Sequence, residues 1–484
     1  MPALSPQSII DGHKGDRTPI PLIVGLVVSG VCMLLALAFY LLQGGPVNVA
    51  IGALLALPTA IVLVGLLLLV DRLEPEPRVN LLLAFGWGAG VAILGALIIN
   101  TVGEAIMTAA FGGGLAEGLT VSVLAPVVEE SVKGSLLLYL LWVRENEIDG
   151  PTDGIVYAGM CGVGFALVEN ILYYMRGLAD PTSSIVGTVI IRGMVAPLGH
   201  PLYTAITGLG VAYAATHRGR RALAIVGGWC GAAFLHSLWN GGLTLFGVPG
   251  MVGAYTIQAG VLITLVVVLI VDRKQLVGQI QRYLPAYIPS GLVQRYDIEM
   301  LGSMAGRKQA RRWARAQAGP TGARAMGDYQ LAATELALLH ARTEQATISP
   351  QEFHGRRQAI LALMRTARDA FFRRVPRAAP PPPPWAAGRA QQSGFFVMPK
   401  QLNNETLPVY PRRPAGPPPG GRPAGGNPAG GRPVGSPPGG NPAGARPPGN
   451  PPAGNPPGGR PPGPPPGGQP PRPPHPPQGG PWRR

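Results

Sequence analysis

Ionisable and amide side chains interrupt the hydrophobic stretches of this chain at four places. They are Glu129-Glu130-Ser131-Val132-Lys133, Phe165-Ala166-Leu167-Val168-Glu169-Asn170, a lone His200, and His236-Ser237-Leu238-Trp239-Asn240. On translocon-based scales, an acidic or basic residue at the centre of a membrane helix costs roughly 2.5–3.5 kcal/mol. Several such residues in one chain therefore predict a shared interior site, where the function should be sought.

Two neighbouring carboxylates and a lysine make up the first motif. Glu129 and Lys133 are four residues apart, in the favourable order for an ion pair on a helix. Glu130 points about 100° away around the helix, so this pair does not account for it. Adjacent carboxylates in a low-dielectric site are expected to differ in acidity, which suits general acid and base work on a water molecule. The alternative interpretation is that all three residues hold helices together.

The other motifs supply a third carboxylate, imidazoles and amides. Phe165 and Glu169 share one helix face, and His236 and Asn240 share another by the same spacing. His236 and Asn240 would be suitable donors to a developing oxyanion. Phe165 and Trp239 are expected to be packing walls rather than chemical groups.

Carboxylates and imidazoles can activate water directly, or they can hold a metal that does so. His200 alone is weak evidence, since a histidine on a span is often a packing residue, but it accompanies the other motifs. The chain has no Gly-x-Ser-x-Gly elbow, no His-Glu-x-x-His helix and no phosphate loop. Amide hydrolysis inside the bilayer fits the remaining parts, and the choice between direct and metal-assisted activation stays open.

Membrane-spanning helices must position these motifs. A span needs about 20 apolar residues to cross some 30 Å of hydrocarbon. The stretch 184–214 contains Pro197 and Pro201, which predict a break within it. The sequence therefore predicts an all-α, polytopic membrane helix bundle of about eight spans. The spans are expected near 20–42, 48–70, 80–101, 119–143, 153–175, 184–214, 222–246 and 251–271.

Lysine and arginine are unevenly distributed among the connections between these spans. The connections on one side carry Lys14, Arg17, Arg72, Arg78, Arg144, Arg218, Arg220 and Arg221. The connections on the other side offer little beyond Arg176. By the positive-inside rule, both termini should be cytoplasmic. The four motifs then fall in one layer between the midplane and the outer leaflet, as a shared site requires.

The chain divides into four regions. Residues 1–19 are expected to be a cytoplasmic N-terminal segment, and 20–271 the membrane domain. Residues 272–375 show helical periodicity, interrupted at Gly319-Pro320, with a helix start at Ser349-Pro350. They predict a small, basic, cytoplasmic helical appendage. Residues 376–484 are rich in Pro and Gly and cannot bury enough apolar surface to offset chain entropy, so this tail is predicted to be disordered.

The formal net charge is +16, although charged residues make up only 13% of the chain. The predicted spans must be nearly free of charge, so the basic residues are gathered outside them. Close to a last span, a basic cluster more often meets anionic lipid than nucleic acid. We therefore expect anionic lipid and the bilayer as partners of the appendage, and no nucleic acid. The cluster comprises Arg307, Lys308, Arg311, Arg312 and Arg315.

At these motifs the sequence resembles the PrsW family of intramembrane proteases, within the superfamily that includes CAAX prenyl endopeptidases and Abi proteins. The resemblance also covers Asp71-Arg72-Leu73-Glu74-Pro75-Glu76-Pro77 and Asp153-Gly154-Ile155-Val156-Tyr157. It spans about residues 50–245 and says nothing about the tail. The motifs occur in order on consecutive predicted spans. This chain has Glu169 where the CAAX branch carries a histidine.

The resemblance implies a multi-pass protease of the plasma membrane, and the Gly, Ala, Pro and Arg bias is compatible with a GC-rich bacterial source. By that likeness, Glu129 would activate the water, with Glu130, Glu169 and His200 as supporting acid/base groups or ligands. His236 and Asn240 would polarise the scissile carbonyl or share in metal binding. The metal set implied for zinc is Glu169, His200 and His236. Lys133, Phe165, Asn170 and Trp239 would give structural support. The implied substrates are single-pass membrane proteins such as anti-sigma factors.

Two other functions remain open. Ionisable side chains within spans also mark proton relays, so a proton-coupled transporter is the first alternative. Inverted repeats would favour it, but the sequence shows no convincing internal symmetry. The second alternative is a non-catalytic scaffold that recruits partners through its tail.

Overall fold

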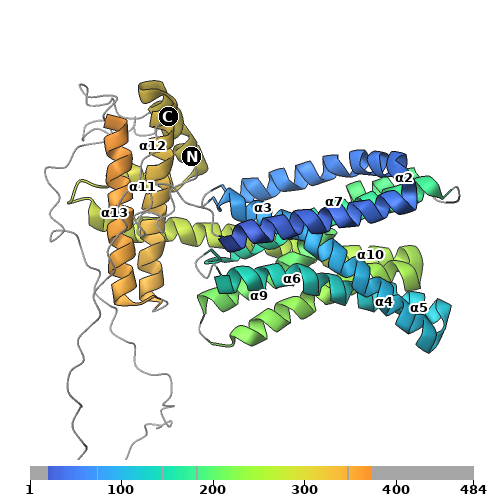
Figure 1. Cartoon of the computed structure of the whole chain (residues 1–484). Helices are drawn as coiled ribbons and strands as arrows, with labels where there is room; N and C mark the ends of the chain where they lie inside the picture. Colours follow the sequence, from blue (N-terminus) through green and yellow to red (C-terminus); the bar gives the residue numbers. More distant parts are fainter. Residues whose placement is uncertain are drawn as a thin grey trace, which may run out of the picture. The chain divides into compact units, whose positions relative to one another are not determined.

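The computed structural model describes residues 20–72, 75–143, 147–180, 182, 184–217, 219–345 and 348–372. Every regular element within these ranges is a helix (Figure 1), which confirms the all-α prediction. The predicted N-terminal segment 1–19 and the predicted disordered tail 376–484 lie outside the described residues.

The elements follow one another as α-helices with four short η segments, of which η1–η3 are π-helical and η4 is 3₁₀. They are α2 (Ile20–Val70), α3 (Arg78–Trp87), η1 (Gly88–Ala92), α4 (Ile93–Phe111), α5 (Gly113–Leu119), η2 (Thr120–Leu124), α6 (Ala125–Val143), α7 (Pro151–Ala179), α8 (Ile185–Val189), η3 (Ile190–Val195), α9 (Gly199–Thr216), α10 (Arg221–Tyr283), η4 (Leu284–Tyr287), α11 (Arg295–Leu301), α12 (Met304–Glu344) and α13 (Pro350–Phe372).

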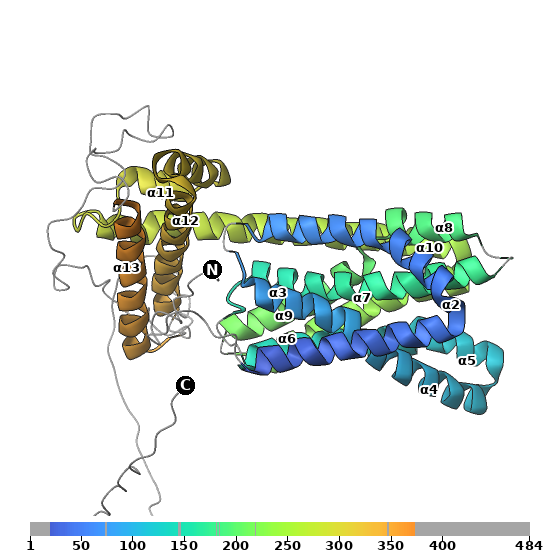
Figure 2. The same cartoon turned by 45° about the horizontal axis from the view of Figure 1, so that its top comes forward.

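Six helices of the described residues are long and apolar enough to cross a membrane, against about eight predicted spans. One reason is that α2 contains two of the predicted spans. Its arms meet at Gly45, which has a φ of 75°, and the chain turns back there (Figure 2). The other reason is α6, whose three ionisable residues lower its apolar character.

The long predicted span at 184–214 is broken, as its prolines indicated. The helical turns of α8 and η3 end at Val195, and α9 begins only at Gly199. Pro197 lies in the break, because a proline cannot donate the backbone hydrogen bond that a continuing helix needs. The break places His200 in the first turn of α9, facing the interior of the bundle.

The centre of the bundle is α7, which is buried along most of its length and packs against α2, α3 and α9 (Figure 1). Glycine permits the close approach of these helices. A methyl group added at Gly154 would lie 2.4 Å from the carbonyl oxygen of Gly208 in α9. Small residues at helix interfaces in membranes allow such backbone contact, and here they bring α7 close to the helix that carries His200.

The appendage is built from the end of α10 together with α11, α12 and α13, around a core of its own. The interruption predicted at Gly319-Pro320 is a kink in α12, where Gly319 has a φ of 66°. The helix start predicted at Ser349 is confirmed, since the Ser349 hydroxyl accepts a hydrogen bond from the backbone N–H of Glu352 at 3.2 Å. The helical prediction for residues 272–375 therefore holds wherever these residues are described.

Candidate active site

The polar motifs that are far apart in sequence meet inside the bundle. α6 supplies Glu129 and Glu130 one turn after the π-helical segment η2. α7 supplies Glu169, α9 supplies His200, and α10 supplies His236. Hydrogen bonds and ion pairs link all four helices through these side chains. Side chains from all four predicted motifs therefore meet in one buried cluster, and its role as the functional site stays a prediction.

Lys133 is the central cation of this cluster and is fully buried. Its Nζ lies 2.8 Å from Glu130 Oε1, 3.5 Å from Glu129 Oε2 and 3.0 Å from His200 Nδ1. The ammonium group also lies 3.8 Å from the centre of the Phe165 ring. A charge removed from water needs such partners on every side. The predicted supporting roles of Lys133 and Phe165 agree with these contacts.

Glu130 has hydrogen-bond partners on both carboxylate oxygens. Oε1 accepts from Lys133 and lies 3.1 Å from His236 Nδ1, and Oε2 accepts from the Thr204 hydroxyl at 3.0 Å. Glu130 therefore orients His236, which is the usual relation between a carboxylate and a functional imidazole.

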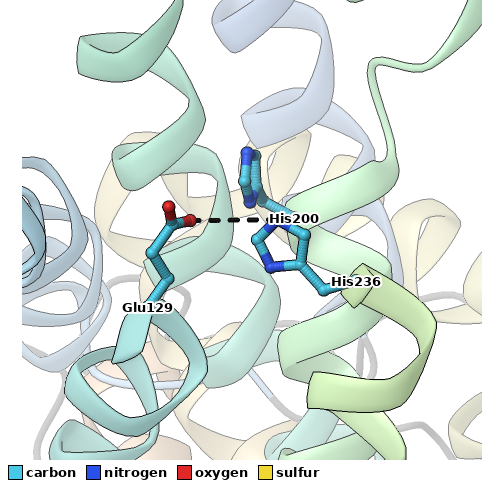
Figure 3. Close-up of side chains that lie close together, drawn as sticks. All are labelled: Glu129, His200 and His236. Carbon is cyan, nitrogen blue, oxygen red and sulfur yellow. Dashed lines mark ion pairs between the residues drawn. The ribbon is translucent and has the colours of Figure 1, made fainter. Parts of the chain in front are cut away.

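Glu129 differs from Glu130, although both are buried. Its Oε2 has no hydrogen-bond partner in the structure. Glu129 Oε2 lies 3.5 Å from Lys133 Nζ and 3.9 Å from His236 Nε2. Figure 3 shows Glu129 facing the two imidazoles. A buried carboxylate oxygen without a hydrogen bond is costly, so this atom is poised for a ligand that the protein itself does not supply.

The hydrogen bonds of His200 determine which ring nitrogen carries its proton. Because an ammonium group can only donate, His200 Nδ1 accepts from Lys133. The proton is then on Nε2, which lies 2.8 Å from Glu169 Oε2. His200 also contacts the Phe165 ring, with ring centres 5.0 Å apart. Glu169 thus positions His200 in the same way that Glu130 positions His236.

Arg192 on η3 forms the outer end of the network. It pairs with Glu169, donates from Nε to Asn170 Oδ1 at 2.7 Å, and lies over the Tyr173 ring. The supporting role predicted for Asn170 fits this contact. Glu169 is thereby held between a guanidinium group and an imidazole.

Two predicted residues lie at the edge of the cluster. The Asn240 amide, on the face of α10 that carries His236, donates to the carbonyl oxygen of Val121 in η2 at 3.1 Å. Trp239 is partly buried and packs near Tyr255, with ring centres 6.5 Å apart, as a packing wall would. Within the described residues, neither side chain forms a hydrogen bond with the carboxylates, so the oxyanion role of Asn240 stays a prediction.

Three residues that the sequence analysis did not single out support the site. Thr204 binds Glu130, Tyr203 stacks on His236 with ring centres 4.8 Å apart, and Gln258 donates to the Tyr203 hydroxyl at 3.0 Å. Tyr203 and Thr204 follow His200 by three and four residues, so they share its helix face. That spacing was available in the sequence, whereas nothing local marked Gln258.

One group in the described residues combines suitable metal donors. The donor atoms of Glu129, His200 and His236 all lie within 4.8 Å of one another. This group differs from the predicted metal set, in which Glu169 stood in place of Glu129. Two imidazoles and one carboxylate are a common catalytic zinc set, and Glu129 Oε2 lacks a hydrogen bond. The residues therefore fit a metal ion, with Glu169 and Glu130 behind the imidazoles.

Comparisons with known proteins agree with this geometry. Residues 76–271 match the model of the family described as "PrsW family intramembrane metalloprotease". The chain is 33% identical over 84 residues to Protease PrsW of Geobacillus kaustophilus (strain HTA426), covering 17% of this chain and 34% of the relative. It is 34% identical over 104 residues to Protease PrsW of Clostridioides difficile (strain 630), covering 21% and 42%.

The chain thus matches less than half the length of these curated relatives, and no solved structure matches it. The family model nevertheless covers α3 through most of α10, including every helix that contributes to the Glu129–His200–His236 group. It also agrees with a multi-pass arrangement of apolar helices. Over residues 76–271, this chain is therefore similar to the PrsW family of intramembrane metalloproteases.

Proposed function

We propose that this protein is an endopeptidase that hydrolyses a peptide bond of single-pass membrane proteins within the bilayer. The observation that carries the proposal is the asymmetry of two adjacent buried carboxylates. Glu130 is bonded on both oxygens, whereas Glu129 Oε2 has no hydrogen bond and lies near His236 Nε2. The free oxygen is available to a water molecule, and the bonded carboxylate is not.

In this mechanism Glu129 accepts a proton from the attacking water and later gives it to the amine that leaves. Lys133 stabilises the negative charge of Glu130, and Glu130 holds His236 through Nδ1, so that Nε2 faces Glu129. When both ring nitrogens of His236 carry a proton, Nδ1 donates to Glu130 and Nε2 donates to the oxygen of the scissile carbonyl as that oxygen becomes negative. Closely packed apolar helices exclude bulk water, which strengthens each of these interactions.

A metal ion held by Glu129, His200 and His236 would supply Lewis-acid activation of the water when bound. Zinc suits this donor set. Glu169 would then orient His200 through Nε2, leaving Nδ1 as the coordinating nitrogen in place of its present contact with Lys133. Zinc content of the purified chain is a direct measurement of this point. Zinc bound by the wild type and lost in the His236→Ala variant would support the assignment.

The substrate class follows from where the site lies. Glu169, His200 and His236 come from segments that are long and apolar enough to span a membrane, so a substrate would present its peptide bond among these segments. A single transmembrane segment can do so after local unwinding. An anti-sigma factor with one span is a substrate of this class, and a plasma-membrane location with both termini cytoplasmic belongs to the same proposal.

The proposal is tested by comparing membranes that contain the wild type, Glu129→Gln or the control Glu117→Gln. Glu117 is an exposed carboxylate on α5, so the control makes the same chemical change outside the cluster. Mass spectrometry maps the new N-termini of released protein fragments. We expect fragments with the wild type and with Glu117→Gln, and a loss of about 10²–10⁴-fold with Glu129→Gln.

Equal fragment yields from equally abundant wild type and Glu129→Gln would refute the protease assignment. Proton-driven solute uptake by proteoliposomes, abolished by Glu129→Gln, would then support the transporter alternative. Loss of function on removing residues 376–484, with Glu129→Gln silent, would instead support the scaffold.

A further inference from the structure

A second polar site lies away from the catalytic cluster, on the appendage. It is an open cleft of about 450 Å³ between the end of α2 and one face of α12. Its lining contains five basic side chains and three small or apolar ones, and no acidic residue. The lining residues are Arg72, Met304, Ala305, Lys308, Arg311, Arg312, Arg315 and Ala323.

The basic side chains come from two segments more than two hundred residues apart. Lys308, Arg311, Arg312 and Arg315 recur at three- and four-residue intervals, so they lie on one face of α12. Arg72 comes from the turn that ends α2. The fold thus adds a fifth cation to a surface that four cations already occupy, although like charges repel.

Within the described residues, none of the five basic side chains of the cleft forms an ion pair with a carboxylate. Both carboxylate oxygens of the neighbouring Asp71 accept a hydrogen bond from the backbone N–H of Glu76, which does not line the cleft. Partial burial and the charge of Arg72 together lower the pKa of Arg311. An anion in the cleft would relieve this repulsion.

We propose that the cleft binds the phosphate headgroup of an anionic membrane lipid. Arg72 lies two residues beyond Val70, where the apolar arm of α2 ends, so we infer that the cleft opens at the level of the lipid phosphates. Met304, Ala305 and Ala323 provide an apolar wall beside the cations. A nucleic acid strand is disfavoured, since no aromatic side chain lines the cleft for base stacking. The bound lipid ties α12 to the end of α2.

The test uses the purified full-length protein in neutral detergent and native mass spectrometry to count bound lipids. The probes are phosphatidylglycerol, phosphatidylcholine and inorganic phosphate. The double variant Arg72→Gln/Arg311→Gln removes two cleft charges. The control Arg295→Gln/Arg324→Gln removes two exposed charges of the appendage that do not line the cleft.

We expect phosphatidylglycerol to bind the wild type and the control with similar affinity, and the cleft variant about 30-fold more weakly. Equal weakening in both double variants would overturn the proposal, because only general charge would then matter. Equally tight phosphatidylcholine would also overturn it. Displacement of phosphatidylglycerol by millimolar inorganic phosphate would assign the cleft to a soluble phosphate instead. Unchanged helix content and unfolding temperature ensure that each variant is folded.

Discussion

The membrane bundle and the appendage both bury charged side chains, but they satisfy them differently. In the appendage, Arg307 donates to the carbonyl oxygen of Leu301 and to the Thr334 hydroxyl, both at 2.9 Å. Arg368 donates to the carbonyl oxygens of Gly291 and Leu292. These cations fasten backbone segments together. In the bundle, by contrast, ionisable side chains bind mainly one another.

The two regions also treat an unbonded carboxylate oxygen differently. Asp297 Oδ1 in the appendage lacks a hydrogen-bond partner, while Oδ2 accepts from the backbone N–H of Gln294 and from the Tyr329 hydroxyl. Burial raises the pKa of Asp297 to about 7, so a proton can neutralise it. Glu129 instead has a lysine and an imidazole within 4 Å. Its free oxygen belongs to a charged network, which is typical of a reactive site.

The comparison of the bundle with the appendage predicts the largest loss of stability when the buried cluster of the bundle loses Lys133. Lys133→Met leaves Glu129 and Glu130 buried without their shared cation. We expect a fall of about 3–5 kcal/mol in the free energy of unfolding in detergent, and no cleavage. The control Lys274→Met makes the same change at an exposed position of α10. A Lys133→Met variant as stable as this control would show that the cluster does not need its central charge.

A smaller loss of stability is expected where a buried cation fastens only backbone and a hydroxyl group. Arg307→Met leaves the Leu301 carbonyl and the Thr334 hydroxyl without their donor, which should cost about 1–3 kcal/mol. Cleavage per folded molecule should be unchanged, and Arg324→Met, at an exposed site of α12, serves as the control. Denaturant unfolding and the fragment assay measure the two quantities. A loss of cleavage without unfolding would place Arg307 in the catalytic machinery after all.

The smallest effect is a pH dependence confined to the appendage. Asp297 has a raised pKa, so the folded state binds a proton more tightly than the unfolded state between about pH 4 and 7. Its contribution to stability is therefore greatest at low pH and falls as pH rises through this range. The lowered pKa of His340, about 4, acts in the opposite sense. A comparison of the wild type with the Asp297→Asn variant removes the contribution of His340, because both proteins contain this residue.

Relative to Asp297→Asn, the wild type should therefore lose stability between pH 5 and pH 8. Amide hydrogen exchange of peptides from α11 and α12 measures this difference in the intact protein. If the stability of the wild type relative to Asp297→Asn instead increased as pH rises, Asp297 would be ionised in the folded state.

The sequence was informative where local chemistry was decisive. Charges in apolar stretches identified the four motifs, Pro197 indicated the break before His200, and Ser349 indicated the start of α13. The number of spans was harder to predict, because the bend at Gly45 joins two of them into α2. The ionisable residues of α6, which carries Glu129 and Glu130, keep this helix out of the set that is apolar enough to span a membrane. The metal set predicted by likeness included Glu169, whereas the close donor group contains Glu129.

By itself, the sequence determined which residues could do chemistry and that they must be buried together, because ionisable groups in a membrane require partners. Only the tertiary structure decided the division of labour among them. Glu129 and Glu130 are adjacent and identical in type, yet the packing of α9 and α10 against α6 brings Thr204 and His236 to Glu130, beside the hydrogen bond from Lys133 of α6 itself. The same packing leaves Glu129 Oε2 without one. Hydrogen bonds from other helices depend on three-dimensional position, which residue type and spacing alone do not specify.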